Sequence, residues 1–162
     1  MKLIPLLFLF AAPLIAEPNY RAELVKWEGY SLTSYADNGY ISCGIGHNLT
    51  AGRNRYSIQY KVGQYYTPHQ IEAYFRDDLI NALYFARKGI WNFDNLPDEA
   101  KFVTISLIWT VGGEGFMKFK NFRLAMSRKM YNLAAMELKD SRWAKQLPIR
   151  AENHIKRLQK IS

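Results

Sequence analysis

Residues 28–47 read EGYSLTSYADNGYISCGIGH, and this stretch decides the fold. Strand-favouring leucine, tyrosine and isoleucine residues flank the sequence DNG at positions 37–39, which is a strong signal for a tight hairpin turn. We therefore expect a small antiparallel sheet over residues 31–47. The glycine-rich residues 44–46 are expected to form its third strand, where glycine permits close approach of another backbone.

A short helix is expected immediately before this sheet, over residues 19–29. Asn19 can cap its N-terminus, and Gly29 can end it just after Glu28. Leu24 and Trp27 supply an apolar side for packing. Glu28 is thus predicted to lie at a helix end that faces the hairpin.

The chain after the sheet has the pattern of a helical region. Thr67, Pro68 and Gln70 form a capping-box start for a long helix that runs to about residue 88. Residues 98–111 are apolar on most faces, which predicts a central buried helix that Gly112 and Gly113 stop. Further helices are expected at residues 116–128, 131–139 and about 148–160.

These elements predict an α+β protein with two lobes in one domain, residues 17–162. The small antiparallel β lobe covers about residues 31–66, of which residues 50–66 fit no element clearly. A long helix joins it to the larger helical lobe, residues 67–162 together with the 19–29 helix.

Composition narrows the range of partners. The 162 residues include 22 Lys and Arg against 14 Asp and Glu, so the net charge of +8 favours a polyanionic partner such as a nucleic acid, an anionic membrane or the bacterial wall. The basic residues are scattered, and no run is typical of a DNA-binding arm or a zinc module, so we expect no nucleic-acid partner, metal or cofactor. Cys43 is the only cysteine and cannot form an internal disulfide; we expect it to be a small buried residue.

The N-terminus has the pattern of an export signal. Lys2 is followed by fourteen residues, 3–16, without a charged or polar side chain. A membrane-spanning helix needs about 20 residues, so this stretch is short for a span and fits the apolar part of a signal peptide. The alternative is a buried N-terminal helix, which Pro5 and Pro13 disfavour. We therefore expect residues 1–16 to be a signal peptide or signal-anchor that directs export to the periplasm or beyond, and any membrane association to involve this segment alone.

Glu28, Asp37 and Ser42 are the candidate catalytic residues. A helix end that faces a hairpin can place two carboxyl groups across one cleft, and glycosidases need such a pair. One carboxyl protonates the leaving oxygen, and the other activates water or stabilises positive charge on the sugar. Each residue alone also has a structural explanation, since an Asp before Asn-Gly is a common turn former.

The surrounding pattern resembles the active-site segment of phage-type lysozymes (glycoside hydrolase family 24, the T-even phage lysozyme group). The residues that carry this resemblance are Glu28, Gly29, Leu32, Tyr35, Asp37, Gly39, Gly44, Ile45, Gly46 and His47. A second segment, residues 109–119, resembles the family's helix followed by a glycine turn. A third resembles its C-terminal helical motif, through Ala134, Ala135, Ser141, Arg142, Trp143, Gln146, Pro148, Arg150 and Ala151. The match covers roughly residues 20–157.

The resemblance implies a monomeric lysozyme that hydrolyses the β-1,4 bonds between N-acetylmuramic acid and N-acetylglucosamine in peptidoglycan and so lyses bacterial cells. Glu28 would be the general acid, and Asp37 would activate water or stabilise charge. Ser42 stands where the family usually has Thr and keeps the hydroxyl without the methyl group that restricts its rotamer. The turn between Asp37 and Ser42 is also one residue shorter than in the T-even form.

The resemblance also implies residues that bind substrate and support the site. The substrate-binding positions are Trp109, Thr110, Phe122 and Glu137, and the supporting positions are His47, Asp78 and Arg150. Trp109 could equally be a core residue, because its helix is so apolar. His47 is expected to pair with Asp78 and tie the β lobe to the connecting helix. Arg150 is expected close to the acid, and Trp143 in the core.

Three other functions remain open at this stage. A lytic transglycosylase cleaves the same bond without water and often relies on one Glu, so the presence of Asp37 favours hydrolysis. A catalytically inactive wall-binding module would be expected to lack one of the two carboxylates, and both are present. A cationic membrane-disrupting protein would kill cells without Glu28.

Overall fold

The computed structural model describes residues 19–50 and 60–161, so the expected export segment at residues 1–16 lies outside the described residues. Its elements are α1 (Tyr20–Glu28), β1 (Ser31–Asp37), β2 (Tyr40–Gly44), β3 (His47–Asn48), α2 (Pro68–Gly89), a 3₁₀ turn (Phe93–Asn95), α3 (Asp98–Met117), α4 (Lys120–Ser127), α5 (Tyr131–Lys139), α6 (Arg142–Gln146) and α7 (Pro148–Lys160).

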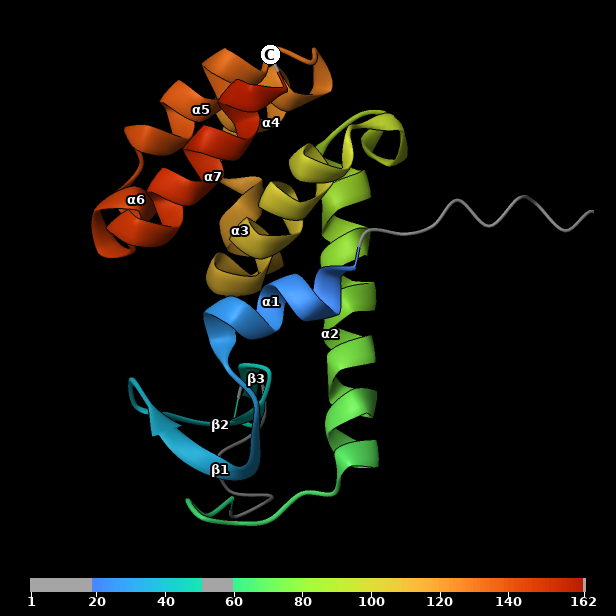
Figure 1. The fold of residues 1–162 in the computed structure, drawn as a ribbon, viewed down its shortest axis with the longest axis vertical. Helices are drawn as coiled ribbons and strands as arrows, with labels where there is room; N and C mark the ends of the chain where they lie inside the picture. The colour runs from blue at the N-terminus through green and yellow to red at the C-terminus, as the bar shows by residue number, and fades with distance from the viewer. Residues whose placement is uncertain (1–18, 51–59, 162) are drawn as a thin grey trace, which may run out of the picture.

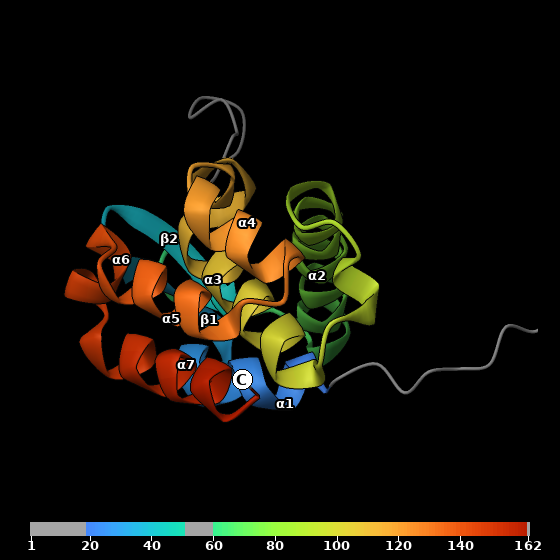
Figure 2. The ribbon, with the colours of Figure 1, turned by 90° about the horizontal axis from the view of Figure 1, so that it is seen from above.

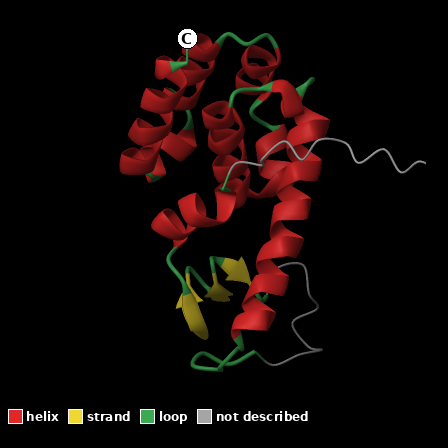
Figure 3. Cartoon of the chain, turned by 45° about the vertical axis from the view of Figure 1, so that its right-hand side comes forward, coloured by secondary structure: helices red, strands yellow, loops and turns green. Residues whose placement is uncertain are grey.

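The predicted α+β class is confirmed. The antiparallel sheet β1-β2-β3 lies at one end of the molecule and the helices gather at the other, while α2 runs from the sheet into the helical region (Figures 1 and 3). Helix α1 precedes the sheet in sequence but contacts α3, so it belongs with the helices. Within the described residues no helix combines the length and the apolar character needed to cross a membrane.

The hairpin with Asn38 and Gly39 at its turn forms as predicted. Asp37 pairs with Tyr40, and the two residues between them, Asn38 and Gly39, have φ values of 45° and 86°. Positive φ at both central positions is the geometry that the Asn-Gly sequence favours in a two-residue hairpin turn. The turn therefore places the Asp37 carboxylate at the tip of β1.

The predicted third strand at residues 44–46 is wrong. Strand β2 ends at Gly44, Ile45 and Gly46 form a turn, and the third strand is the two-residue β3. Gly44 and Gly46 have φ values of +62° and +71°, a backbone region that glycine adopts readily and that an extended strand does not use. Gly44 and Gly46 therefore form a bend that brings the backbone of the β2–β3 turn close to the helices.

Helix α2 begins as its sequence predicts. The Thr67 hydroxyl accepts from the Gln70 backbone N–H at 3.3 Å, and the Gln70 side chain accepts from the Thr67 backbone N–H at 2.9 Å. This reciprocal capping satisfies two backbone donors at the start of the helix.

The predicted end of the central helix needs correction. Gly112 breaks the helical path (φ 71°, ψ 165°), but helical turns resume and α3 ends only at Met117. The helix expected at residues 116–128 is therefore the shorter α4. Helix α6 was not expected at all, because five residues are too few for helical periodicity to be recognised.

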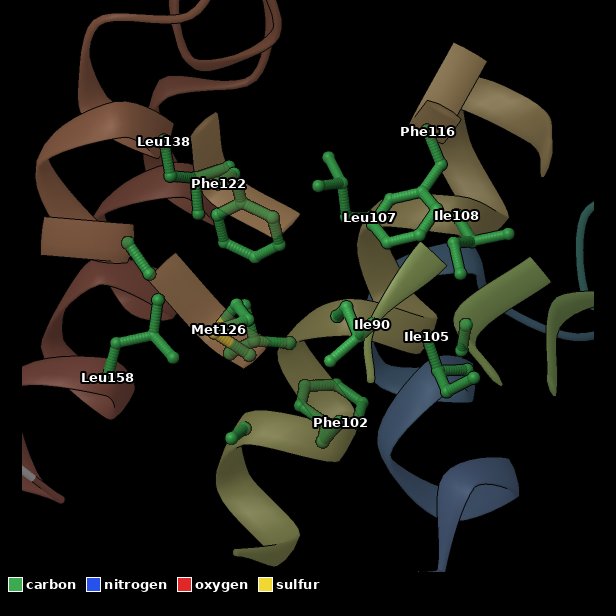
Figure 4. Packing of buried hydrophobic residues seen from close by; sticks show 14 of the residues in the cluster. Ile90, Phe102, Ile105, Leu107, Ile108, Phe116, Phe122, Met126, Leu138 and Leu158 are labelled. Atoms are coloured by element: carbon green, nitrogen blue, oxygen red, sulfur yellow. The ribbon is translucent and has the colours of Figure 1, made fainter. Parts of the chain in front are cut away.

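Two apolar cores hold the molecule together. The larger surrounds α3, which is buried continuously over residues 101–108 and lies between α2 on one side and α5 and α7 on the other (Figure 2). Its side chains pack closely, as Leu107 and Phe116 show (Figure 4). A smaller core beneath the sheet contains Cys43, Leu49, Tyr66 and Ile71.

Cys43 is the small buried residue that the sequence predicts. Its side chain is fully buried, and this burial raises the pKa of its thiol to about 11, so the thiolate form is disfavoured.

Candidate active site

Glu28 is the last residue of α1, and its side chain is only 18% exposed. Its Oε1 accepts a hydrogen bond from Nη1 of Arg150 at 2.6 Å. Arg150 lies in the first turn of α7 and is itself buried, with a side chain 7% exposed. The expected closeness of Arg150 to the candidate acid is therefore present as a short, charge-assisted contact.

Arg150 is fixed by further contacts on α1 and α3. Its Nε and Nη2 both donate to the Ser106 hydroxyl, at 3.1 and 2.8 Å. The guanidinium group also lies over the ring of Trp27, 5.5 Å from its centre. Because the guanidinium fork is planar and rigid, these contacts determine where Nη1 points.

The other carboxylate oxygen of Glu28 faces the sheet. A Cβ atom at Gly46 would lie 3.1 Å from Oε2 of Glu28 and 3.5 Å from Nε1 of Trp109, so the absence of a side chain lets the β2–β3 turn approach the carboxylate. Trp109 donates from Nε1 to the carbonyl oxygen of Ile45 at 3.1 Å. Glu28 therefore sits where α1, α3 and the glycine turn meet.

A hollow of about 140 Å³ opens beside this meeting point. It lies between the β2–β3 turn, α2 and α3, and its lining includes Gly46, Asn48, Asp78, Asn81 and Trp109. The indole of Trp109 therefore contributes both to the packing between the lobes and to the wall of the hollow. Polar groups beside an aromatic wall are suited to binding a sugar ring.

Asp37 and Ser42 lie together on the hairpin. The Ser42 hydroxyl donates to Oδ2 of Asp37 at 3.4 Å, and the Asn38 amide donates to Oδ1 at 3.2 Å. Ser42 is buried, whereas Asp37 is exposed. The pair thus joins a solvent-accessible carboxylate to a hydroxyl held in place by the sheet.

Tyr35 connects the two carboxylates electrostatically. It pairs with Ser42 across the hairpin, and its pKa is raised first by burial and then by the negative charges of Asp37 and Glu28. Tyr35 is therefore within electrostatic reach of both carboxylates.

The predicted contact between His47 and Asp78 is present. Nδ1 of His47 lies 2.8 Å from Oδ2 of Asp78, and the His47 ring stacks on Tyr74 with its centre 4.4 Å away. Because His47 begins β3 and Asp78 lies in α2, the contact joins the sheet to the long helix.

The other three expected substrate-binding residues, Thr110, Phe122 and Glu137, do not line the hollow at Trp109. Thr110 accepts from Nε1 of Trp143 at 2.8 Å, so its hydroxyl is tied to the core. Phe122 is 1% exposed and packs among core side chains (Figure 4), and a buried ring offers no face to a sugar. Glu137 and Phe122 border a separate hollow of about 310 Å³ that shares no lining residue with the one at Trp109.

Two residues of this region were not predicted. Ser106 contacts Arg150 and also lies 2.8 Å from Nε2 of His154, and both Ser106 and His154 are buried. The sequence signal is slight: Ser106 interrupts an apolar run, and His154 follows Arg150 by one helical turn.

Over residues 19–50 and 60–161, no group of three or more His, Cys, Asp or Glu side chains is arranged to hold a metal ion.

Comparisons with known proteins agree with this geometry. A family model described as phage lysozyme matches residues 25–160. The peptidoglycan hydrolase gp36 of Pseudomonas phage phiKMV is 29% identical over 143 residues, which are 86% of this chain but only 15% of the phage protein. Two probable T4-type lysozymes of Dictyostelium discoideum are 28% and 25% identical, over 82% of this chain and 89% of each relative.

Proposed function

The chain belongs to the phage lysozyme family, a family of glycoside hydrolases, and we propose that it is a muramidase. Its substrate is peptidoglycan, and the bond cut is the β-1,4 linkage between N-acetylmuramic acid and N-acetylglucosamine. The observation that carries the proposal is the partly buried Glu28, with one oxygen bonded to Arg150 and the other turned towards Gly46 and Trp109.

Glu28 acts as the general acid. Arg150 can only donate hydrogen bonds, so it engages an unprotonated oxygen, Oε1. The catalytic proton is therefore carried on Oε2. It passes to the glycosidic oxygen as the bond to the anomeric carbon breaks, which lets the sugar leave as an alcohol.

Asp37 and Ser42 act on the second half of the reaction. The exposed carboxylate stabilises positive charge at the anomeric carbon or removes a proton from the attacking water. The Ser42 hydroxyl, bonded to Oδ2 of Asp37, orients that carboxylate or the water. Water supplies its hydroxyl to the anomeric carbon, and its remaining proton restores the acid.

Hydrolysis is favoured over a transglycosylase reaction by the second carboxylate. A transglycosylase uses a hydroxyl of the sugar itself as the nucleophile and needs no carboxylate to activate water. Asp37 and Ser42, already in contact on the hairpin, give this chain the groups that a water molecule requires. The same groups would have no purpose in a wall-binding module without catalysis.

The protein acts outside the cytoplasm as a monomer. The apolar residues 3–16 support export, and the net charge of +8 favours capture of anionic wall polymers. Deletion of residues 1–16 is expected to leave a folded, active enzyme in the cytoplasm. A deletion variant that fails to fold would show that the segment is structural.

The deciding experiment is digestion of purified peptidoglycan followed by mass spectrometry of the released muropeptides. Hydrolysis gives products with a reducing N-acetylmuramic acid end, each one water heavier than the anhydro product of a transglycosylase. Glu28→Gln protein should release neither. Anhydro products would contradict the proposal in favour of a transglycosylase, and lysis without sugar products would favour membrane disruption.

A further inference from the structure

Three nitrogen atoms converge on the hydroxyl of Ser106 in the middle of the helical region. Nε and Nη2 of Arg150 lie 3.1 and 2.8 Å away, and Nε2 of His154 lies 2.8 Å away. Ser106 is on α3, whereas Arg150 and His154 are one turn apart on α7. All three residues are buried, so hydrogen bonds among them are protected from competition by water.

The number of protons in this cluster fixes the direction of every hydrogen bond. A guanidinium group only donates, so the two N–H groups of Arg150 use both lone pairs of the Ser106 oxygen. The Ser106 proton is then left to donate to Nε2 of His154. In this arrangement Nε2 of His154 accepts from Ser106, so the ring is neutral and carries its proton on Nδ1.

The surroundings of His154 agree with a neutral ring. Aromatic rings of Trp27, Phe102 and Trp143 enclose it from α1, α3 and α6, with centres 5.6 to 5.9 Å away. Within the described part of the chain, the Nδ1 proton of this arrangement has no hydrogen-bond partner, which is an energetic cost that the contacts of Ser106 must offset.

The charges around His154 act in the same direction. The charged groups that act on the ring are the cations Arg150 and Arg157, both on α7. Arg157 is paired in turn with Glu23 of α1 and Glu99 of α3. Burial first, and then the two arginines, lower the pKa of His154 to about 3.

We propose that Ser106 and His154 are positioning residues for the general acid, acting through Arg150. Neutral His154 accepts a hydrogen bond from the Ser106 hydroxyl, which leaves the lone pairs of the serine oxygen free to accept from both Nε and Nη2 of Arg150. Arg150 is thereby oriented with Nη1 on Oε1 of Glu28, and the catalytic proton is kept on Oε2. This inference rests on the proposed hydrolase function and adds to its site two residues that act through Arg150.

Four variants separate positioning from simple packing. Ser106→Ala removes the shared acceptor, and His154→Leu removes the partner that orients the hydroxyl. His154→Gln can still offer an oxygen to Ser106 but does not titrate. The control is Thr104→Val, a second buried hydroxyl residue of α3, because among the described residues the Thr104 hydroxyl donates to the Ala100 carbonyl of its own helix and to no other group.

We expect Ser106→Ala and His154→Leu to lower kcat on peptidoglycan roughly 10- to 100-fold with little change in KM, because the acid is misoriented while the sugar-binding wall is intact. His154→Gln should recover most of the lost kcat. Thr104→Val should lower the thermal midpoint and leave kcat unchanged. Wild-type kcat in Ser106→Ala and His154→Leu would overturn the proposal while leaving the hydrolase function standing.

A measurement that needs no activity completes the test. Nitrogen NMR of the imidazole in the wild-type protein should show a proton on Nδ1 and none on Nε2 at neutral pH, with the same pattern in mildly acidic buffer. A charged ring, or a proton on Nε2, would overturn the hydrogen-bond directions whether or not the protein cuts peptidoglycan. Failure of the wild type to cut it would refute the proposed function instead.

Discussion

Arg150 donates to Oε1 of Glu28 across 2.6 Å, although the two residues are 122 positions apart in the chain. The contact joins α1 to α7 and leaves Oε2 as the oxygen that faces the glycine turn. The pair therefore determines which oxygen of Glu28 is free to react in the proposed mechanism.

Replacing Glu28 by Gln should abolish turnover. The amide retains an oxygen for Nη1 of Arg150, so the fold is preserved, but it has no acidic proton to give. General acid catalysis contributes about 10²–10⁴-fold, and we expect a loss in this range or larger. The measurement is initial rate on peptidoglycan, with circular dichroism to verify folding. The matched control is Glu152→Gln, an exposed carboxylate on α7 paired with Lys156, which should keep wild-type rate.

Ser42→Thr should be tolerated or increase the rate, whereas Asp37→Asn should be severely impaired. Threonine keeps the hydroxyl that donates to Asp37 and restricts its rotamer, while asparagine removes the charge on which that contact depends. Steady-state rates of the two variants check this, with Ser42→Ala as the variant that lacks the hydroxyl altogether. Equal rates for the alanine and threonine variants would show that the hydroxyl has no part in catalysis.

Trp143→Ala should lower the free energy of unfolding by roughly 3–5 kcal/mol, as is usual for a buried aromatic residue. The indole is 4% exposed, stacks on His154 and donates to Thr110. Urea unfolding followed by far-ultraviolet circular dichroism would measure the change. Trp91→Ala is a suitable comparison, because that indole is 77% exposed. Similar losses in both variants would contradict a core role for Trp143.

The stability of the protein should fall in acid because of His154. The pKa of His154 is lowered from 6.5 to about 3 in the folded protein. The unfolded chain therefore binds a proton at this residue below about pH 6.5, whereas the folded protein binds it only below about pH 3. Between these limits the free energy of unfolding should fall with decreasing pH by up to about 1.4 kcal/mol per unit. Chemical denaturation between pH 3 and pH 6.5 measures the free energy of unfolding at each pH. This free energy should depend less steeply on pH in His154→Gln than in the wild type. Parallel slopes would show that His154 is protonated in the folded state.

Local rules explain which elements the sequence predicts well. The Asn38-Gly39 turn and the reciprocal cap of Thr67 and Gln70 depend on neighbouring residues only, and both form as expected. Glu28 and Asp37 follow from the same local motifs, because each lies at the end of an element that the sequence defines.

The features that the sequence does not reveal depend on distant contacts or on unusual backbone. Residues 44–46 look like a strand by composition, but their glycines are used for a bend against Glu28. Ser106 and His154 meet from 48 positions apart, and nothing local to either residue indicates the other. Phe122 matches a substrate-binding position in the family pattern, yet its ring is packed into the core.

The distance in sequence between Glu28 and Arg150 also has a consequence for biosynthesis. A chain emerging from the ribosome forms α1 early, but α7, which carries Arg150, only after nearly all other helices have been made. Until then Glu28 lacks Arg150, and the core of the helical lobe lacks the side chains that α7 contributes. A product truncated before α7 lacks Arg150, and we therefore expect it to have no activity on peptidoglycan.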